Sequence, residues 1–177
     1  MTAATVVELL GLLDGVGIEA WLDGGWAVDA ALEAQLRPHD DLDLVVRLSD
    51  VETLVGVLAS HGYEHVHGTA PGSVELVDPD GRQVDVHPVV FRPTGDGAYV
   101  MEGGGIWIYP ASGFSGLGVV SGHEVRCLTP EVQMLCHTGY EPHRSSYDDV
   151  WALGRRFGLS VPDEYRSPRE TYPVRTD

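Results

Sequence analysis

The sequence predicts an α+β fold, in which a mixed β-sheet is flanked by helices and followed by a small C-terminal extension of strands and helices. Short apolar runs that alternate with polar residues recur between turn signals, and such runs are typical of strands. Stretches with helical periodicity separate some of these runs but not others, so the chain differs from a regular βαβ repeat. The hydrophobic content of 43% and the charged content of 21% are ordinary for a globular domain.

The first half of the chain contains most of the predicted sheet. We expect helices over residues 4–14, about 26–35 and 49–60, and strands near 18–23, 42–46, 63–67, 73–77 and 82–89. Ser49 and Glu52 have the spacing of a capping box at the start of the third helix. The tetrapeptide "DPDG" at residues 78–81 predicts a turn between two of the strands.

The composition changes near residue 92, where we place a soft domain boundary between residues 1–92 and residues 93–177. Glycine is frequent in the residues that follow. In this second part we expect strands at 106–109 and 123–128, a helix that begins at Pro130 after a Thr129 cap, and a last helix over about 146–157 that ends at Gly158. The tail from about residue 162 contains several prolines and is expected to be loosely ordered.

The sequence carries no signal for a membrane or an export route. No apolar stretch approaches the roughly 20 residues of a membrane span, and the first residues lack the positive region of a signal peptide. Cys127 and Cys136 are too few for a disulfide framework, which favours buried thiols over a bridge between them. We therefore expect a cytoplasmic protein.

The charge of the chain limits its partners. Asp and Glu number 27 against 11 basic residues, all of them arginine, and the formal net charge is −16. Binding to a phosphate backbone depends on Lys and Arg, so this charge argues against a nucleic acid as partner. It would attract a cationic small molecule, although solubility alone would also explain it.

The segment "DDLDLVV" (residues 40–46) places carboxylates on a predicted strand. Strands alternate their side chains, so Asp41 and Asp43 would project from one face while Leu42 and Leu44 project from the other. One face could then pack on the core, and the other would present two carboxylates a few ångströms apart, as Mg²⁺ requires. In a chain with so many acids, an isolated Asp-x-Asp pair is more often a solvated strand edge.

The strand "QVDVHPVV" (residues 83–90) repeats this pattern. Val84 and Val86 would point inward, and Asp85 and His87 would lie on the opposite face. If the two strands are neighbours, Asp85 joins the first pair of carboxylates. Three carboxylates could hold two metal ions about 3.5–4 Å apart, the arrangement that assists phosphoryl transfer.

Gly24 and Gly25 lie between a predicted strand and a helix, where bare backbone and a helix N-terminus can approach phosphate, although a glycine pair alone is also a common turn. The order of strand, Gly-Gly, helix, Asp-x-Asp and a later Asp resembles the signature of the DNA polymerase β-like nucleotidyltransferase superfamily. The string "WLDGGWAVDAAL…RPHDDLDL" is more similar still to the small antibiotic nucleotidyltransferases, namely the lincosamide nucleotidyltransferases and the aminoglycoside 2''-nucleotidyltransferases.

The resemblance covers about residues 20–92, and more loosely residues 123–153, whereas residues 93–122 have no counterpart that we identify. "VDVHPV" resembles the strand with the third carboxylate, and "RCLTPEVQMLCHTGYEPHRSSYDDV" the C-terminal helical segment of the lincosamide branch. Leu36 departs from the pattern, because the antibiotic branch tends to have Thr there. Residues with counterparts in these families include Trp26, Asp29, Arg37, His39 and Asp40.

This resemblance implies a nucleotidyltransferase fold and a Mg²⁺-dependent enzyme. The expected reaction moves a nucleoside monophosphate, AMP from ATP, onto a hydroxyl of a small molecule such as a lincosamide or aminoglycoside, and releases pyrophosphate. No element that would read the nucleotide base is recognisable in the sequence. The resemblance also implies a homodimer, and it assigns to residues 93–177 a part in binding the acceptor.

The site residues follow from the same resemblance. Asp41, Asp43 and Asp85 would be the catalytic residues and the metal ligands, holding two Mg²⁺ ions, with Asp85 also the candidate general base. The nucleotide would bind to Gly24, Gly25, Arg37, His39 and Asp40. Candidates for binding the acceptor are His87, Tyr140, Asp148 and Asp149, although orienting a neighbour, capping a helix or facing solvent would explain His87 and the two acids as well.

Other interpretations stay open at this stage. A non-catalytic or toxin–antitoxin relative of the same fold could bind nucleotide or a protein partner, although retention of all three carboxylates favours an enzyme. A tailoring enzyme of natural-product assembly would use the same chemistry on another acceptor. Trp107 and Tyr109 share one strand face, where core packing is the simpler role and a substrate-stacking wall the alternative.

Overall fold

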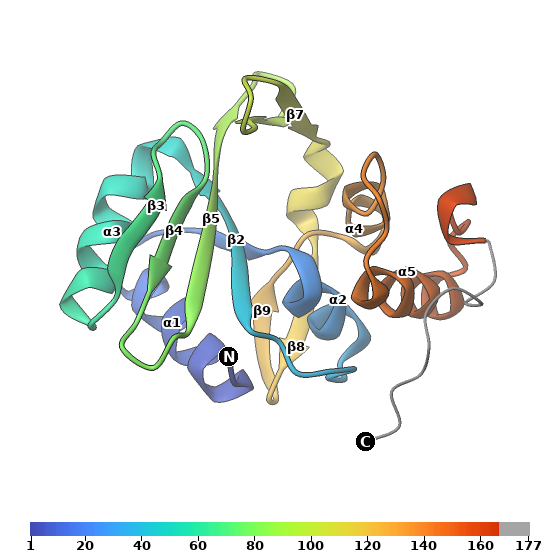
Figure 1. Cartoon of the computed structure of the whole chain (residues 1–177), viewed down its shortest axis with the longest axis horizontal. Coiled ribbons are helices and arrows are strands. Elements are labelled where there is room, and N and C mark those ends of the chain that lie inside the picture. Colours follow the sequence, from blue (N-terminus) through green and yellow to red (C-terminus); the bar gives the residue numbers. More distant parts are fainter. Residues whose placement is uncertain (167–177) are drawn as a thin grey trace.

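The structure, a computed structural model, describes residues 1–166 of the chain and has a seven-stranded mixed sheet at its centre (Figure 1). Its strands are β1 (Ala20–Leu22), β2 (Asp41–Arg47), β3 (Glu64–Gly68), β4 (Val74–Val77), β5 (Gln83–Phe91), β6 (Gly97–Val100) and β7 (Ile106–Tyr109). The order is β1-β2-β5-β4-β3, and β6 and β7 continue the sheet from the end of β5. β2 and β5 run parallel, and the other neighbours in this sheet are antiparallel.

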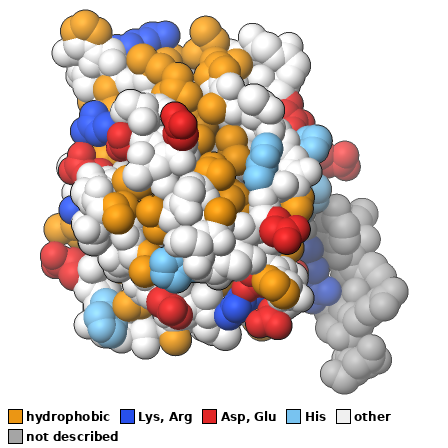
Figure 2. All heavy atoms as spheres, turned by 90° about the vertical axis from the view of Figure 1, so that its left-hand side faces the viewer, with side chains coloured by type: hydrophobic (Ala, Val, Ile, Leu, Met, Phe, Trp, Pro, Cys, Tyr) orange, Lys and Arg blue, Asp and Glu red, His pale blue; other side chains and the backbone are white. Residues whose placement is uncertain are grey.

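Helices cover one face of this sheet and pack beside β2 (Figure 1), and the side of the molecule with α3 and β3, seen in Figure 2, carries a mixture of hydrophobic, charged and histidine side chains. The face is covered by α1 (Ala3–Gly15) and α3 (Val51–Ser60), while α2 (Gly24–Leu32), α4 (Pro130–Cys136) and α5 (Arg144–Phe157) pack on one another beyond β2. A two-stranded sheet of β8 (Leu117–Val120) and β9 (His123–Arg126) contacts α2 and β1. Short 3-10 helices span Leu48–Asp50, Ala111–Ser115 and Asp163–Tyr165.

The main core lies between the sheet and the helices α1 and α3. The inward-facing side chains of β2 and β5 are buried there, among them Leu42, Leu44, Val84 and Val86. Burial of each such side chain stabilises the fold by about 1.5–3 kcal/mol. Since side chains alternate along a strand, this burial fixes the register of β2 on β5 and directs their polar side chains to the opposite face.

Two smaller cores stabilise the rest of the molecule. One lies on the opposite face of the sheet, next to β7, and consists of Trp21, Val45, Val89, Tyr109, Leu128 and Val132. The other joins α2, α4 and α5 through Val28, Met134, Val150, Leu153 and Tyr165. This third core fixes α5 against α2 and so determines where the polar side chains of α5 lie.

The predicted fold class is confirmed, whereas several predicted helix ends are not. α2 ends at Leu32 because Glu33 takes a left-handed conformation with φ of 56°. The predicted capping box is wrong. Ser49 lies in a 3-10 helix, where its hydroxyl donates to the carboxylate of Asp50, and α3 begins without a side-chain cap. Thr129 precedes the first residue of α4 as expected, but its side chain makes no capping hydrogen bond.

The glycine-rich residues after position 92 contain two strands that the sequence did not predict, β6 and β8. β6 pairs with residues 89–91 of β5, so the β6–β7 hairpin extends the main sheet (Figure 1). Gly97 and Ala98 have too little side chain to produce an alternating pattern, which explains why β6 escaped prediction. Cys127 and Cys136 are both free thiols.

The described part of the tail is packed on the protein. Tyr165 is fully buried, and its hydroxyl donates to the carbonyl oxygen of His137 at 2.7 Å. The remainder of the segment that was expected to be loosely ordered, residues 167–177, lies outside the described residues. Within residues 1–166, no helix has the length and apolar character needed to cross a membrane.

We predict that Tyr165 anchors α5. Replacing it with Ala should lower the free energy of unfolding by about 3 kcal/mol, because a buried aromatic ring is removed, and Tyr165→Phe should cost about 1 kcal/mol. Tyr147→Phe is the matched control, since the Tyr147 hydroxyl lies 3.4 Å from the carbonyl of Glu164 at the surface. Urea denaturation would measure all three, and equal stability of Tyr165→Ala and the control would contradict the prediction.

Candidate active site

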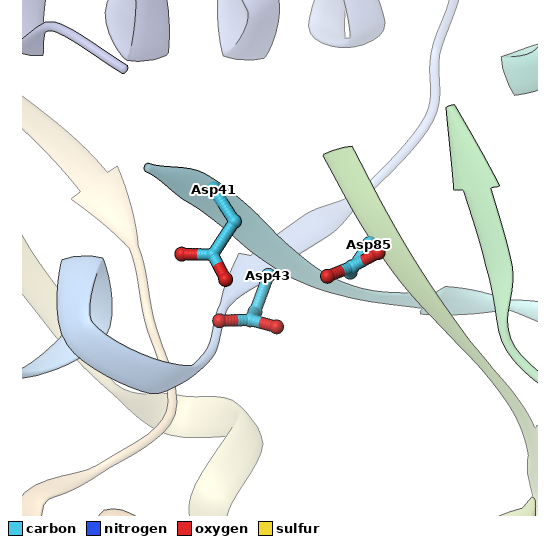
Figure 3. Close-up of side chains that lie close together, drawn as sticks. All are labelled: Asp41, Asp43 and Asp85. Carbon is cyan, nitrogen blue, oxygen red and sulfur yellow. The ribbon is translucent and has the colours of Figure 1, made fainter. Parts of the chain in front are cut away.

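Three carboxylates converge where β2 and β5 run side by side. In the parallel register Asp43 pairs with Asp85, and Asp41 lies one pleat away on the same face. The three side chains point into a common space beside the sheet (Figure 3), and each offers an oxygen within 4.8 Å of the others. Such a set of hard oxygen donors could hold a divalent cation.

The carboxylates of this triad repel one another. Burial raises the pKa of Asp43 to about 7, and the neighbouring charges of Asp41 and Asp85 add to the rise. His87 opposes it in part. Burial also raises the pKa of Asp85, although the amide of Gln83 donates to its two oxygens at 3.1 and 3.0 Å and works against that rise. A cation between the carboxylates would relieve this repulsion.

The glycine pair begins α2 directly beside the triad. Gly24 has φ of +57°, and a Cβ there would overlap the carboxylate of Asp43. A Cβ on Gly25 would overlap the ring of His39 and lie 2.8 Å from the guanidinium of Arg37. Only glycine therefore fits at either position. The N–H of Gly24 donates to the Asp23 carboxylate, and the positive end of the helix dipole at this N-terminus could attract an anion next to the carboxylates.

The loop between α2 and β2 supplies the other residues predicted for nucleotide binding. Arg37 forms an ion pair with Asp149, in which Arg37 Nη2 lies 3.1 Å from Asp149 Oδ2. The side chain of Arg37 is 30% exposed. His39 is buried and bonds through Nε2 to Asp29. Asp40 is exposed immediately before β2. Arg37 and His39 thus flank Gly25, and Asp40 faces solvent beside them.

A cavity of about 530 Å³ opens next to the triad. Asp43 and Gly24 form part of its wall, so the cavity adjoins both the carboxylate triad and the start of α2. Of the predicted acceptor residues, His87 and Tyr140 line the cavity, whereas Asp148 is exposed on α5 and Asp149 is buried against Arg37. Its aromatic and apolar wall consists mainly of Tyr99, Met101, Trp107, Tyr109 and Tyr140.

Asp23 belongs to the site, although the sequence did not single it out. This buried residue caps α2 and accepts hydrogen bonds from Gly24 N at 2.8 Å, the Tyr109 hydroxyl at 3.0 Å and Gln133 Nε2 at 2.8 Å. Burial alone would raise the pKa of Asp23, but hydrogen bonds and the nearby His87 hold it below the usual value. Its position before a helix start is an N-cap signal, but nothing local indicates Tyr109 or Gln133.

Core packing, the simpler of the two roles predicted for Tyr109 and Trp107, is confirmed, and the stacking role stays a prediction. Tyr109 is buried in the core next to β7 and bonds to Asp23, while Trp107 is half-buried. Both rings also line the cavity. Core packing and a stacking wall are therefore compatible on this one strand face.

The chain matches a family model and curated relatives over most of its length. The model for aminoglycoside-2''-adenylyltransferases matches residues 5–153. A lincosamide resistance protein of Staphylococcus haemolyticus is 25% identical over 150 residues, which cover 85% of this chain and 92% of that protein. A 2''-aminoglycoside nucleotidyltransferase of Escherichia coli is 27% identical over 134 residues, covering 71% and 67% respectively.

Solved structures agree with these relatives. A lincosamide antibiotic adenylyltransferase, LnuA with lincomycin bound, superposes with a TM-score of 0.77 at 25% identity, over 86% of this chain and 96% of that chain. ANT(2'')-Ia in complex with adenylyl-2''-tobramycin gives a TM-score of 0.70 at 18% identity, over 88% and 89%. The second likeness concerns the fold alone.

We predict that the triad destabilises the metal-free protein. In the folded protein the pKa of Asp43 is raised from 3.8 to about 7. The free energy of unfolding therefore falls as pH rises from about 4 to about 7, and the whole loss of stability is present at about pH 8. Asp43→Asn should then raise the free energy of unfolding by about 1–3 kcal/mol in EDTA, and by less at about pH 5.

Thermal unfolding would measure this effect, with Glu64→Gln on exposed β3 as the control for loss of one charge. Addition of Mg²⁺ should stabilise the original protein more than the Asp43→Asn variant, because the variant lacks one ligand. A lower melting temperature for Asp43→Asn in EDTA would contradict the prediction.

Proposed function

The chain belongs to the aminoglycoside-2''-adenylyltransferase family of antibiotic nucleotidyltransferases, and from that premise we propose that it transfers AMP from ATP to a hydroxyl group of a small molecule. One observation carries the proposal: the carboxylate triad lies between the N-terminus of α2 and the cavity, and Asp43 and Gly24 line that cavity. A phosphate chain at the helix and an acceptor in the cavity would therefore meet at the triad.

Asp41, Asp43 and Asp85 would hold Mg²⁺, and we propose two ions. Their fit rests on the oxygen chemistry of the donors and on their convergence, since burial, together with the charges of neighbouring carboxylates, raises the pKa of Asp43 and Asp85. When bound, the cations would neutralise charge on the phosphates and on the departing pyrophosphate. Asp85 would stay ionised beside them, since a neighbouring positive charge favours the carboxylate form.

Asp85 is the proposed general base. Its carboxylate would accept the proton of the acceptor hydroxyl, and the hydroxyl oxygen would bond to the α-phosphorus of ATP. The bond from that phosphorus to the bridging oxygen would break, and pyrophosphate would leave with the electron pair. Gln83, which donates to both oxygens of Asp85, would orient the base.

The β- and γ-phosphates would bind at the start of α2. The backbone N–H of Gly25 would donate to a phosphate oxygen, and that of Gly24, which donates to Asp23, would share its hydrogen with one, helped by the helix dipole. Arg37 and His39 lie against Gly25, where Arg37 would add positive charge and His39 a hydrogen bond from the other side. The chain contains no lysine, so arginine, backbone and metal would share the phosphate charge.

The cavity favours an amphiphilic acceptor of the lincosamide kind over a polycationic aminoglycoside. Its wall is largely aromatic and apolar, and such surfaces bind apolar groups and a single ammonium well. Of its carboxylates, Asp23 is already saturated with hydrogen bonds and Asp43 is assigned to the metal. Few free negative charges are therefore left in the wall to pair with several amines.

The composition supports a small-molecule acceptor rather than a polynucleotide, because the chain has 27 acidic residues and only 11 arginines. We expect the enzyme to work in the cytoplasm, where its nucleotide donor would be available. The homodimer also stays a prediction, which light scattering of the purified protein would test.

We predict that the protein forms a nucleoside monophosphate adduct in the presence of Mg²⁺. Purified protein would be incubated with ATP, GTP, CTP and UTP and with a panel of lincosamides, aminoglycosides and other hydroxylated antibiotics, and the products identified by mass spectrometry. Asp85→Asn should lower kcat on the order of 100-fold or more, because the base is lost. Glu75→Gln, which changes the residue paired with Asp85 on β4, should retain most activity.

Each other result has a distinct meaning for the proposal. Full activity of Asp85→Asn would remove it as the base. Nucleotide binding that depends on Mg²⁺ but yields no adduct would support the site and move the search to other acceptors, including those of biosynthetic enzymes. No nucleotide binding would contradict the proposed function and favour a non-catalytic protein of this fold.

The cavity wall yields a separate prediction. Trp107→Ala should raise the KM for lincomycin about tenfold, because an aromatic surface is lost, and leave the KM for ATP nearly unchanged. Ile106→Ala is the matched control, since Ile106 is the preceding residue of the same strand and is 60% exposed. Steady-state kinetics would decide, and equal KM values for the two variants would place the acceptor elsewhere.

A further inference from the structure

We propose that Asp149 is a positioning residue that holds the guanidinium of Arg37 over the first turn of α2, and so sets the affinity of the enzyme for the phosphate chain of its nucleotide. The inference rests on the proposed function, which assigns the phosphates to that helix N-terminus. Asp149 had been a candidate for binding the acceptor. Its burial to 2% exposure and its ion pair with Arg37 indicate this other role.

Arg37 lacks the support of regular structure. It lies in the segment between α2 and β2, where residues 33–40 form neither helix nor strand. A long arginine side chain on such a segment loses much rotamer freedom when it is held in one place. Besides its bond to Asp149, the guanidinium contacts only its own neighbour among the hydrogen bonds described for residues 1–166, through Nη1 and the carbonyl of Pro38 at 3.3 Å.

Asp149 provides the fixed point. It lies on α5 beside Val150, and Val150 and Leu153 are fully buried in the core that joins α5 to α2 and α4. Oδ2 of Asp149 accepts from Arg37 Nη2 at 3.1 Å and lies 3.8 Å from Nε2 of His137. A carboxylate on a packed helix thus ties a mobile type of side chain to the rigid part of the molecule.

The held guanidinium still has an unused donor. Arg37 Nε is buried and has no hydrogen-bond partner within the described residues, although buried N–H groups are normally satisfied. Nη2 lies so close to Gly25 that a side chain there would come within 2.8 Å of it. Arg37 is therefore placed at the proposed anion position with a donor that the protein does not satisfy, and a phosphate oxygen has the chemistry to satisfy it.

The negative charge of Asp149 acts against this effect, because it lowers the positive potential that phosphate would experience. Burial lowers the pKa of His137, whereas the carboxylate of Asp149, 3.8 Å from its Nε2, raises it. Replacement of Asp149 therefore removes both an opposing charge and the anchor of Arg37, and Asp149→Glu, which keeps the charge, separates the two effects. We expect the displacement of Arg37 to outweigh the loss of the opposing charge, so that replacing Asp149 weakens phosphate binding.

The test measures binding of MgATP, of inorganic pyrophosphate with Mg²⁺ and of adenosine by calorimetry. Asp149→Asn should weaken MgATP and pyrophosphate about tenfold, as expected for a misplaced binding group, and leave adenosine unchanged. In steady-state assays the KM for ATP should rise while kcat changes little. The double variant Arg37→Gln with Asp149→Asn should bind no more weakly than Arg37→Gln alone, because the two residues act as one unit.

Two further variants separate position from charge and from folding. Asp149→Glu keeps the charge but moves the carboxylate by one methylene, so it should also weaken pyrophosphate binding, whereas a purely electrostatic role requires unchanged affinity. Asp163→Asn removes one acidic charge at the surface, where Asp163 pairs with Arg166, and should bind as the original protein does. Melting temperatures would verify that each variant is folded. If Asp149→Asn does not fold, the binding measurements on Asp149→Glu test the proposal.

The failures are distinguishable. If Arg37→Gln weakens pyrophosphate binding and both Asp149 variants bind it as well as or better than the original protein, the inference is overturned and the proposed function stands. If the original protein binds neither pyrophosphate nor MgATP, or Arg37→Gln binds them unchanged, the assignment of the phosphates to this helix N-terminus is wrong, and the proposal for Asp149 is overturned with it.

Discussion

The parallel pairing of β2 with β5 is the constraint on which the site depends. Leu42, Leu44, Val84 and Val86 are buried on one face of these strands, and the triad occupies the other face. Because side chains alternate strictly, a slip of one residue in either strand would bury a carboxylate and expose an aliphatic side chain. The hydrophobic core therefore also fixes the geometry of a polar site that it does not contact.

Helix α2 connects that site to the rest of the molecule. Its first two residues leave no space for side chains, since Asp43 lies against one and Arg37 and His39 against the other. Asp23 caps the helix and joins it to β7 and α4, while the third core packs it on α5. The position of this N-terminus is thus determined by several elements at once, which would suit the proposed binding of phosphate at a fixed place.

Negative charge has opposite effects on stability and function in this protein. Burial and the clustering of carboxylates raise the pKa of Asp43 and Asp85, and this works against the folded state when no cation is bound. A divalent cation bound between the carboxylates would relieve their repulsion. By contrast, Asp23 and Asp149 are buried acids whose pKa is lowered, because each has hydrogen-bonding or cationic partners. The local surroundings, rather than burial alone, separate these two kinds of carboxylate.

The sequence by itself determined the α+β class, the alternation that puts Asp41 and Asp43 on one face of a strand and Asp85 on the polar face of another, and the glycine pair at a helix start; the pairing that brings the three acids together comes from the tertiary structure. These features follow from local patterns with periods of two or a few residues. Only the tertiary structure decided the contacts of Asp23 with Tyr109 and of Asp149 with Arg37, whose partners are 86 and 112 residues apart. No local pattern encodes such pairs, because packing of whole elements brings them together. The burial of Asp149, a predicted candidate for binding the acceptor, escaped prediction for the same reason: the core next to it is assembled from three separate helices.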